Sequence, residues 1–118
     1  MDEWQMHLVA VYLDAGLGEG RKLVELIVDV RNVGATNSGF IGYPMLLRDA
    51  QGRTYEWDQM ASWVCKDMLG LESGGSMNPG QTARVCVAYD VPLDARSFTT
   101  SPVSIVGMWQ GGFAFELP

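Results

Sequence analysis

The stretch KLVELIVDVRNVG, residues 22–34, decides the fold class. Its apolar side chains recur at every second position and share one side of an extended chain: Val24, Leu26, Val28 and Val30. Charged side chains take the opposite side: Glu25, Asp29 and Arg31. Because side chains alternate between the two faces of a strand, this pattern predicts a strand with one face in the core and the other in water. The turn-rich residues 32–39 end it.

A second strand is predicted in NPGQTARVCVAYDVP, residues 78–92. Pro79 and Gly80 suit the two central positions of a type II turn. Pro92 ends the strand because it has no backbone N–H to donate to a ladder. The main apolar row has five members: Ala83, Val85, Val87, Tyr89 and Val91. Cys86 lies on the opposite side of this strand.

Further short strands surround these two. Residues 7–16 and 40–49 show the period-2 alternation of strands. The compact turn at 49–52 places Asp before Gly and leads into a returning strand at 53–57, which makes a hairpin. Residues 96–118 supply the last strand or two.

Residues 58–69 depart from the strand pattern. Their large apolar residues stand at i, i+3, i+4 and i+8, the spacing of a helix: Met60, Trp63, Val64 and Met68. Asp58 precedes them as a plausible N-cap. We therefore expect a short helical segment near 58–69 that caps one open end of the sheets.

The number and spacing of these elements define the expected architecture. A chain of 118 residues fits a single domain, 1–118. About seven short strands joined by turn signals favour an all-β, immunoglobulin-like antiparallel β-sandwich. A small closed barrel is the alternative.

The charge of the chain narrows the possible partners. The formal net charge is −6, and eight Lys and Arg residues stand against 14 Asp and Glu residues. A binder of phosphate backbones needs clustered basic residues, so we expect no nucleic acid partner, and anionic membrane surfaces are disfavoured for the same reason. No stretch approaches the ~20 apolar residues that a membrane-spanning segment requires.

Three segments together resemble a known family. LIVDVRNVG, MLLRDAQGRTYE and NPGQTARVCVAYDVP occur in the order found in the immunoglobulin-like domain of the immunoprotective extracellular family of exported bacterial proteins and lipoproteins. The matching positions are Asn32, Asp49, Gly52, Tyr55, Pro79, Gly80, Val91 and Pro92. Tyr89 departs from the family's usual Phe, and residues 58–77 are less typical. The resemblance covers residues 8–118 and implies a β-sandwich, a secreted or cell-envelope location and no established catalytic activity.

The sequence holds little that suggests catalysis. A Ser or Cys nucleophile needs a nearby base, and His7 is the single imidazole of the chain. No nucleophile elbow and no phosphate-binding glycine loop is present. Asp90 and Asp94 could share a loop end with another acid, but solvated carboxylates are the simpler interpretation. We expect no enzyme activity, no metal and no cofactor.

The two cysteines leave more than one possibility open. Cys65 falls in the helical segment and Cys86 in the second predicted strand. A disulfide would tie the long 58–77 excursion to a strand, and closing such a loop contributes ~3 kcal/mol in the chain-entropy model. Two free, partly buried thiols are the alternative, and a reactive or metal-bound thiol is a third.

Large apolar residues gather around the predicted helix and suggest a partner-binding patch. Its members are Trp57, Met60, Trp63, Met68 and Met77. One interpretation is that these side chains plug an end of the sandwich. The other is an exposed, adaptable patch for a protein partner or an apolar ligand.

Two functional hypotheses follow. The first is a non-enzymatic immunoglobulin-like binding module of the bacterial cell envelope or secreted fraction. The second is an intracellular inhibitor or protein-binding module on a similar sandwich. A formed Cys65–Cys86 bridge favours export, and reduced thiols favour the cytoplasm. Exposed edge strands also allow a homodimer.

Overall fold

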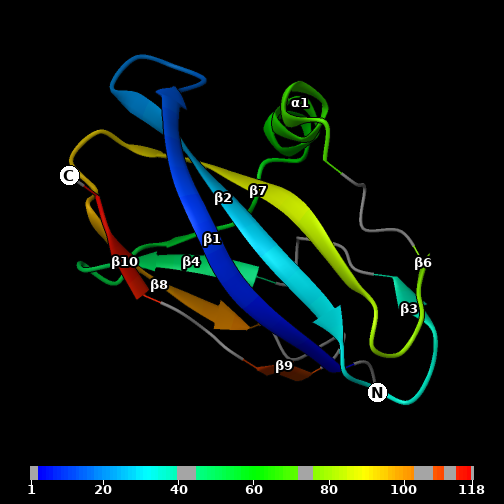
Figure 1. Cartoon of the computed structure of the whole chain (residues 1–118). Coiled ribbons are helices and arrows are strands. Elements are labelled where there is room, and N and C mark those ends of the chain that lie inside the picture. Colours follow the sequence, from blue (N-terminus) through cyan, green and yellow to red (C-terminus); the bar gives the residue numbers. More distant parts are fainter. Residues whose placement is uncertain (1–2, 40–44, 72–75, 103–107, 111–113, 118) are drawn as a thin grey trace.

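The computed structural model describes residues 3–39, 45–71, 76–102, 108–110 and 114–117. These residues form two layered β-sheets, with a helix lying against the outside of one of them (Figure 1). The predicted sandwich with a short helix is therefore confirmed. No helix in these ranges is both long enough and apolar enough to cross a bilayer.

The first sheet is built around β2 (Arg21–Asn32), the strand predicted from its alternation. β1 (Glu3–Ala15) pairs with it on one side and β7 (Thr82–Pro92) on the other, both antiparallel. β9 (Met108–Gln110) joins the far side of β1 and runs parallel to it, unlike the antiparallel neighbours that the sequence predicts. The sheet order is β7-β2-β1-β9, so β7 and β9 are its edges.

The second sheet has the order β10-β8-β4-β5 and is antiparallel. Its strands are β10 (Ala114–Glu116), β8 (Ser97–Pro102), β4 (Met45–Asp49) and β5 (Thr54–Tyr55). A separate small pair joins β3 (Ser38–Gly39) to β6 (Ser76–Met77).

The described residues thus contain ten strands, more than the seven or so predicted. Five of them are only two or three residues long, too short for an alternating pattern to show in the sequence. Two segments of the predicted strands, 40–44 and 103–107, lie outside the described residues.

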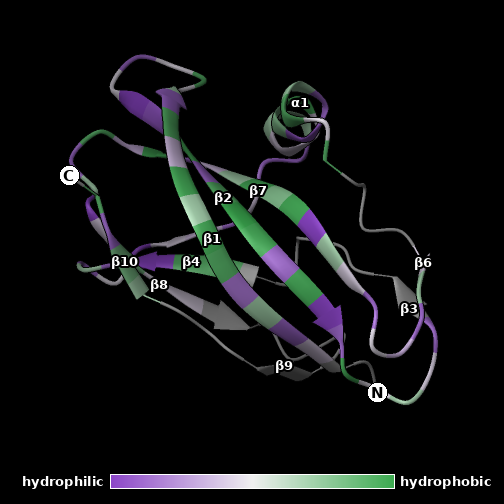
Figure 2. Ribbon diagram, in the orientation of Figure 1, coloured by the Kyte–Doolittle hydropathy of each residue, from purple (hydrophilic) through white to green (hydrophobic). Residues whose placement is uncertain are grey.

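The core fills the space between the two sheets, and β1, β2 and β7, which carry many of its residues, show long hydrophobic stretches (Figure 2). The predicted apolar row of β2 is fully buried there: Val24, Leu26, Val28 and Val30. Tyr89 of β7 is also fully buried in this cluster, as are Leu47 of β4 and Phe98 of β8. Each such aliphatic side chain contributes ~1.5–3 kcal/mol, so the core dominates stability over the surface ion pairs at ~0–1 kcal/mol.

Two buried polar side chains hold the turns that join these strands. The Asn32 amide donates to the backbone oxygens of Thr36 and Met77, both at 2.9 Å, and its oxygen accepts from the Gly34 amide. This side chain therefore fastens the end of β2 to β6. Asn32 is one of the positions that carry the family resemblance, and here its side chain satisfies backbone groups that the strand end leaves open.

Asp49 holds the predicted 49–52 hairpin turn. Its carboxylate accepts from the Gln51 and Arg53 amides at 3.0 Å, from Arg53 Nε at 2.6 Å and from the Tyr55 hydroxyl at 2.7 Å. Gly52 adopts a φ of 82°, as the turn prediction requires. Burial opposes ionisation of Asp49, but the hydrogen bonds from Tyr55 and Arg53 outweigh it and lower the pKa of Asp49 to about 2.

Candidate binding surface on helix α1

Helix α1 (Gln59–Leu69) begins and ends with well-formed caps. The Asp58 carboxylate accepts from the Ala61 amide at 2.8 Å, which confirms the predicted N-cap. Gly70 ends the helix with a φ of 65°, the left-handed conformation that glycine adopts most readily. Both ends of the helix are therefore set by its own capping residues, Asp58 and Gly70.

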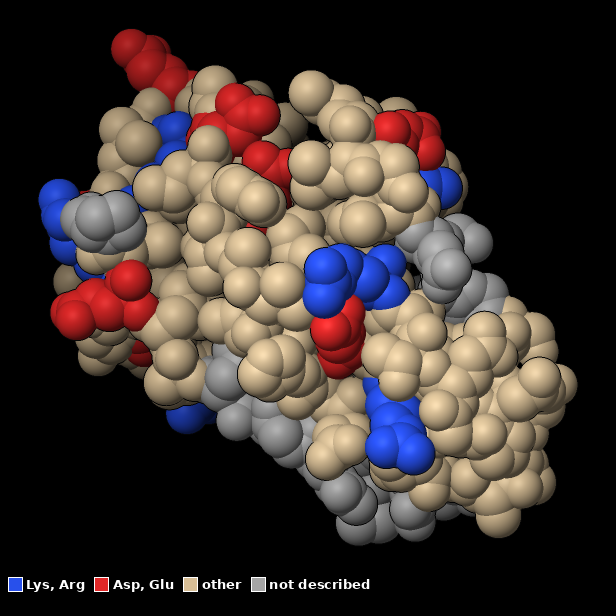
Figure 3. Space-filling view, viewed as in Figure 1, with Lys and Arg blue, Asp and Glu red and all other residues tan. Residues whose placement is uncertain are grey.

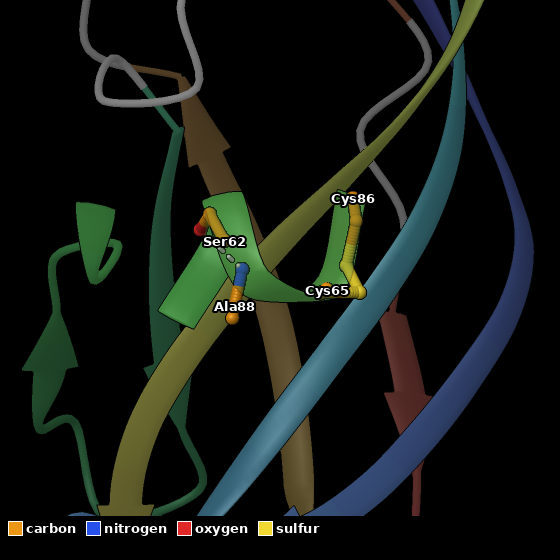
Figure 4. Close-up of a disulfide and its surroundings, with 4 residues drawn as sticks. All are labelled: Ser62, Cys65, Cys86 and Ala88. Atoms are coloured by element: carbon orange, nitrogen blue, oxygen red, sulfur yellow. Dashed lines mark hydrogen bonds between the residues drawn. A yellow bond between two sulfur atoms is a disulfide. The ribbon is translucent and has the colours of Figure 1, made fainter. Parts of the chain in front are cut away.

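Two hydrogen bonds to the backbone of Ala88 attach α1 and its N-cap to the edge strand β7. The Asp58 amide donates to the Ala88 oxygen at 2.8 Å, and the Ala88 amide donates to Ser62 Oγ at 2.8 Å (Figure 4). Ala88 would otherwise present both of its backbone groups on the outer side of an edge strand. The helix thus covers part of this edge. Homodimerisation through edge strands stays a prediction.

A disulfide between Cys65 and Cys86 fixes the helix to the same strand (Figure 4). The two Cα atoms are 6.1 Å apart, and both side chains are buried. Together with Ile27 they form a second, smaller apolar cluster on the outer face of the first sheet. Of the alternatives that the sequence leaves open, the structure contains the disulfide.

The helix is oriented opposite to the amphipathic pattern of its sequence. The side chains that it buries are small: Ala61, Ser62 and Cys65. Its large apolar side chains are exposed: Met60 by 67%, Trp63 by 49%, Val64 by 53% and Met68 by 78%. We call these four residues the α1 ridge. For these helix residues, the structure contradicts the interpretation that they plug an end of the sandwich.

Two members of the predicted patch lie elsewhere. Met77 sits on β6 and is 1% exposed, so it belongs to the main core and is a correction to the prediction. Trp57 is half-buried and packs against the same core. Met60, Trp63 and Met68 of the predicted patch are exposed together with Val64, whose helical spacing was visible in the sequence. Partner binding by this patch stays a prediction.

A hollow of about 120 Å³ lies between α1 and the outer face of the first sheet. We call it the Glu25 hollow, and it is lined by Tyr12, Asp14, Glu25, Cys65, Met68 and Leu69. Tyr12 and Glu25 are cross-strand neighbours on β1 and β2, and Met68 continues from the α1 ridge into the hollow wall. The hollow and the ridge therefore form one continuous surface.

The Glu25 hollow carries negative charge without a matching cation. Acidic side chains gather between the end of β1 and α1 (Figure 3). Burial raises the pKa of Glu25, and the nearby Asp14 carboxylate raises it further. Across the part of the chain that the structure describes, Glu25 has no hydrogen-bond or ion-pair partner.

The cysteine sulfurs and Asp90, which were candidates for metal binding, are engaged in other contacts. Glu25 Oε and the sulfurs of Cys65 and Cys86 lie within 4.8 Å of one another, but the bonded sulfurs offer no thiolate. Asp90 pairs with Arg21 at 2.6 Å. His7 is exposed opposite Asp29, whose carboxylate binds Arg84 at 2.8 Å.

The fold class defined by these features is a two-sheet β-sandwich with one short helix. No family model matches the chain, and no curated protein sequence matches it. Among solved structures, the chain is similar to a secreted protein of Mycobacterium tuberculosis, MPT63, with a TM-score of 0.52. The sequences are 11% identical over 96% of this chain and 80% of MPT63, so the similarity shows the fold. The resemblance to the immunoprotective extracellular family stays a prediction.

Proposed function

We propose that this protein is an extracellular, non-enzymatic binding module of the bacterial cell envelope or secreted fraction, and that it recognises a protein partner through the α1 ridge. The observation that carries the proposal is the orientation of α1. A helix with buried Ala61, Ser62 and Cys65 and an exposed Trp and two exposed Met residues is oriented against its own hydrophobic pattern.

The attachment of α1 explains how this orientation is maintained. A helix free to roll would turn its large apolar side chains toward the sheet, because each buried one contributes ~1.5–3 kcal/mol. The disulfide and the Ser62–Ala88 hydrogen bond oppose that rotation, since both hold the small face against β7. The ridge is thus presented to solvent on a rigid support, which lowers the entropy cost of binding a partner.

The composition of the ridge supports a protein partner. Trp and Met are enriched at protein interfaces relative to the rest of the surface, and Trp is prominent among the residues that dominate binding energy. Met side chains also adapt to irregular partner surfaces. An exposed apolar group of this kind marks an interaction site more often than an isolated exposed residue does.

Two observations support an extracellular location. A structural disulfide persists in oxidising compartments and is rare in the cytosol. The fold is similar to that of a protein described as secreted, and the family resemblance points the same way. The intracellular inhibitor is the less favoured alternative, because it would require the Cys65–Cys86 bond to form under reducing conditions.

The test compares two double variants as bait on extracellular and envelope fractions of the organism that encodes the protein. Met60→Gln/Trp63→Gln removes two of the four ridge side chains, whereas Leu17→Gln/Leu93→Gln removes apolar side chains of similar exposure away from α1. The proposal expects the ridge variant to lose the captured proteins and the control to keep them. Identical sets of captured proteins from both variants would contradict it.

A further inference from the structure

The Glu25 hollow has the size of a side-chain pocket. Its volume of about 120 Å³ suits a single amino-acid side chain better than a cofactor or drug-sized ligand, which needs ~300–1,000 Å³. Met68 belongs to both the hollow and the α1 ridge, so a partner that covers the ridge also reaches the hollow.

The lining combines an apolar wall with two carboxylates. Met68, Leu69 and the disulfide provide apolar surface, and Tyr12 adds an aromatic ring. Glu25 is half-buried and Asp14 is exposed, and no basic side chain is among the described residues that line the hollow. A Lys or Arg side chain matches this combination, since its aliphatic stem packs on apolar surface while its cationic end meets carboxylates and the face of an aromatic ring.

We propose that the Glu25 hollow binds a Lys or Arg side chain of the protein partner, whose flanking apolar residues lie on the α1 ridge. This inference rests on the proposed function, because it specifies the chemistry of the partner at the same surface. It defines the partner as a polypeptide segment that carries a basic residue among apolar ones.

Charge complementarity favours this occupant over two others. A second copy docking through the same surface would bring Glu25 and Asp14 of one molecule against those of another, in a chain of net charge −6. An anionic lipid surface would be repelled by the same carboxylates. A basic segment instead gains an ion pair that neither alternative offers.

The first experiment uses n-hexylammonium as a probe of the hollow on the whole chain, with hexanol and hexanoate as matched neutral and anionic probes. We expect saturable chemical-shift changes for the backbone amides of Tyr12, Glu25 and Met68 with hexylammonium. Hexanol and hexanoate should bind more weakly. Glu25→Gln should weaken hexylammonium binding about fivefold, the size of a partly exposed ion pair.

A control variant and a contradicting result complete this experiment. Glu116→Gln changes a carboxylate on β10, in the other sheet, and should leave binding unchanged. Asp14→Asn serves as a second test if Glu25→Gln fails to fold. Equal binding of hexylammonium and hexanol, or no effect of either carboxylate substitution, would overturn the inference.

The second experiment separates this inference from the proposed function by adding Glu25→Gln to the capture test above. Loss of the captured proteins with both the ridge variant and Glu25→Gln supports both proposals. Loss with the ridge variant alone overturns the inference and leaves the function standing. Retention with both variants overturns the function, whatever the hexylammonium result.

Discussion

Removal of the disulfide should weaken the protein mainly by releasing α1. The change is Cys65→Ala/Cys86→Ala, which leaves small apolar side chains in the space between the helix and β7. The two cysteines are 21 positions apart, and closing a loop of that length contributes about 3 kcal/mol in the chain-entropy model. We therefore expect the free energy of unfolding to fall by about that amount.

The assay is urea unfolding followed by tryptophan fluorescence, at equal protein concentration with and without reductant. With an m-value of ~1–3 kcal/mol/M, a loss of about 3 kcal/mol lowers the midpoint by about 1–3 M. Native protein should lose the same stability on reduction, whereas the double-alanine variant should not respond to reductant. That comparison removes any effect of the reductant itself.

Hydrogen exchange tests where the stability is lost. The main core cluster contains no α1 residue, so the sandwich should persist when the helix is released. We expect the α1 amides of the variant to exchange faster while the central amides of β2 keep most of their protection. A loss below about 1 kcal/mol, or equal loss of protection in α1 and β2 under native conditions, would refute this account.

Three further predictions test other contacts. Ser62→Ala should cost ~1–3 kcal/mol in urea unfolding, because it leaves the buried Ala88 amide without its acceptor, and a cost near zero would contradict that role. The pKa of Asp49 is lowered to about 2, so its ionised form stabilises the fold above pH ~4, and this contribution disappears as the pH falls toward 2. Asp49→Asn should therefore lower stability at neutral pH and flatten the acid limb, and an unchanged acid limb would exclude Asp49 as its source. Met60→Gln/Trp63→Gln should change stability by less than about 1 kcal/mol, since both side chains are exposed, and thermal melting checks this.

β2 and β7 of the first sheet were predictable because a strand shows in its own residues which side faces the core. In β2 each apolar residue is two positions from the next, so Val24 and Glu25 must point to opposite faces. The Asp49 turn was predictable for a similar reason, because its hydrogen bonds are local. The parallel β9 was not, since its direction depends on how the chain crosses between sheets rather than on its three residues.

Helix α1 was predicted in the right place, but the sequence left open whether its large apolar face points inward or outward. Its large apolar residues follow the helical period, and hydrophobicity alone turns such a face toward the core. The Cys65 and Cys86 Cα atoms are 6.1 Å apart, which brings the helix backbone too close to β7 for Met or Trp side chains to fit between them. The informative signal was the row of small residues that includes Cys65, because a half-cystine that bonds a strand must face it.

Met77 was grouped with the exposed helix residues in the predicted patch, but it is a core residue. It follows the Met-rich helical segment in the sequence, yet β6 returns it to the main core beside the Asn32 side chain, which donates to its backbone oxygen at 2.9 Å. Proximity along the chain therefore grouped a core residue with surface ones. The pairing of β6 with β3 places Met77 apart from the helix residues, and the sequence gives no sign of this pairing.

The covalent attachment of α1 gives its two faces separate roles. Ala61, Ser62 and Cys65 supply the contacts that hold the helix, so the ridge residues contribute little to folding and polar residues could replace them at small cost. Exposed Met and Trp side chains reduce solubility without stabilising the sandwich, and a ridge that stayed uncovered would be a liability. Under the proposed function, a partner covers both the ridge and Glu25, whose carboxylate has no ion-pair partner among the residues that the structure describes.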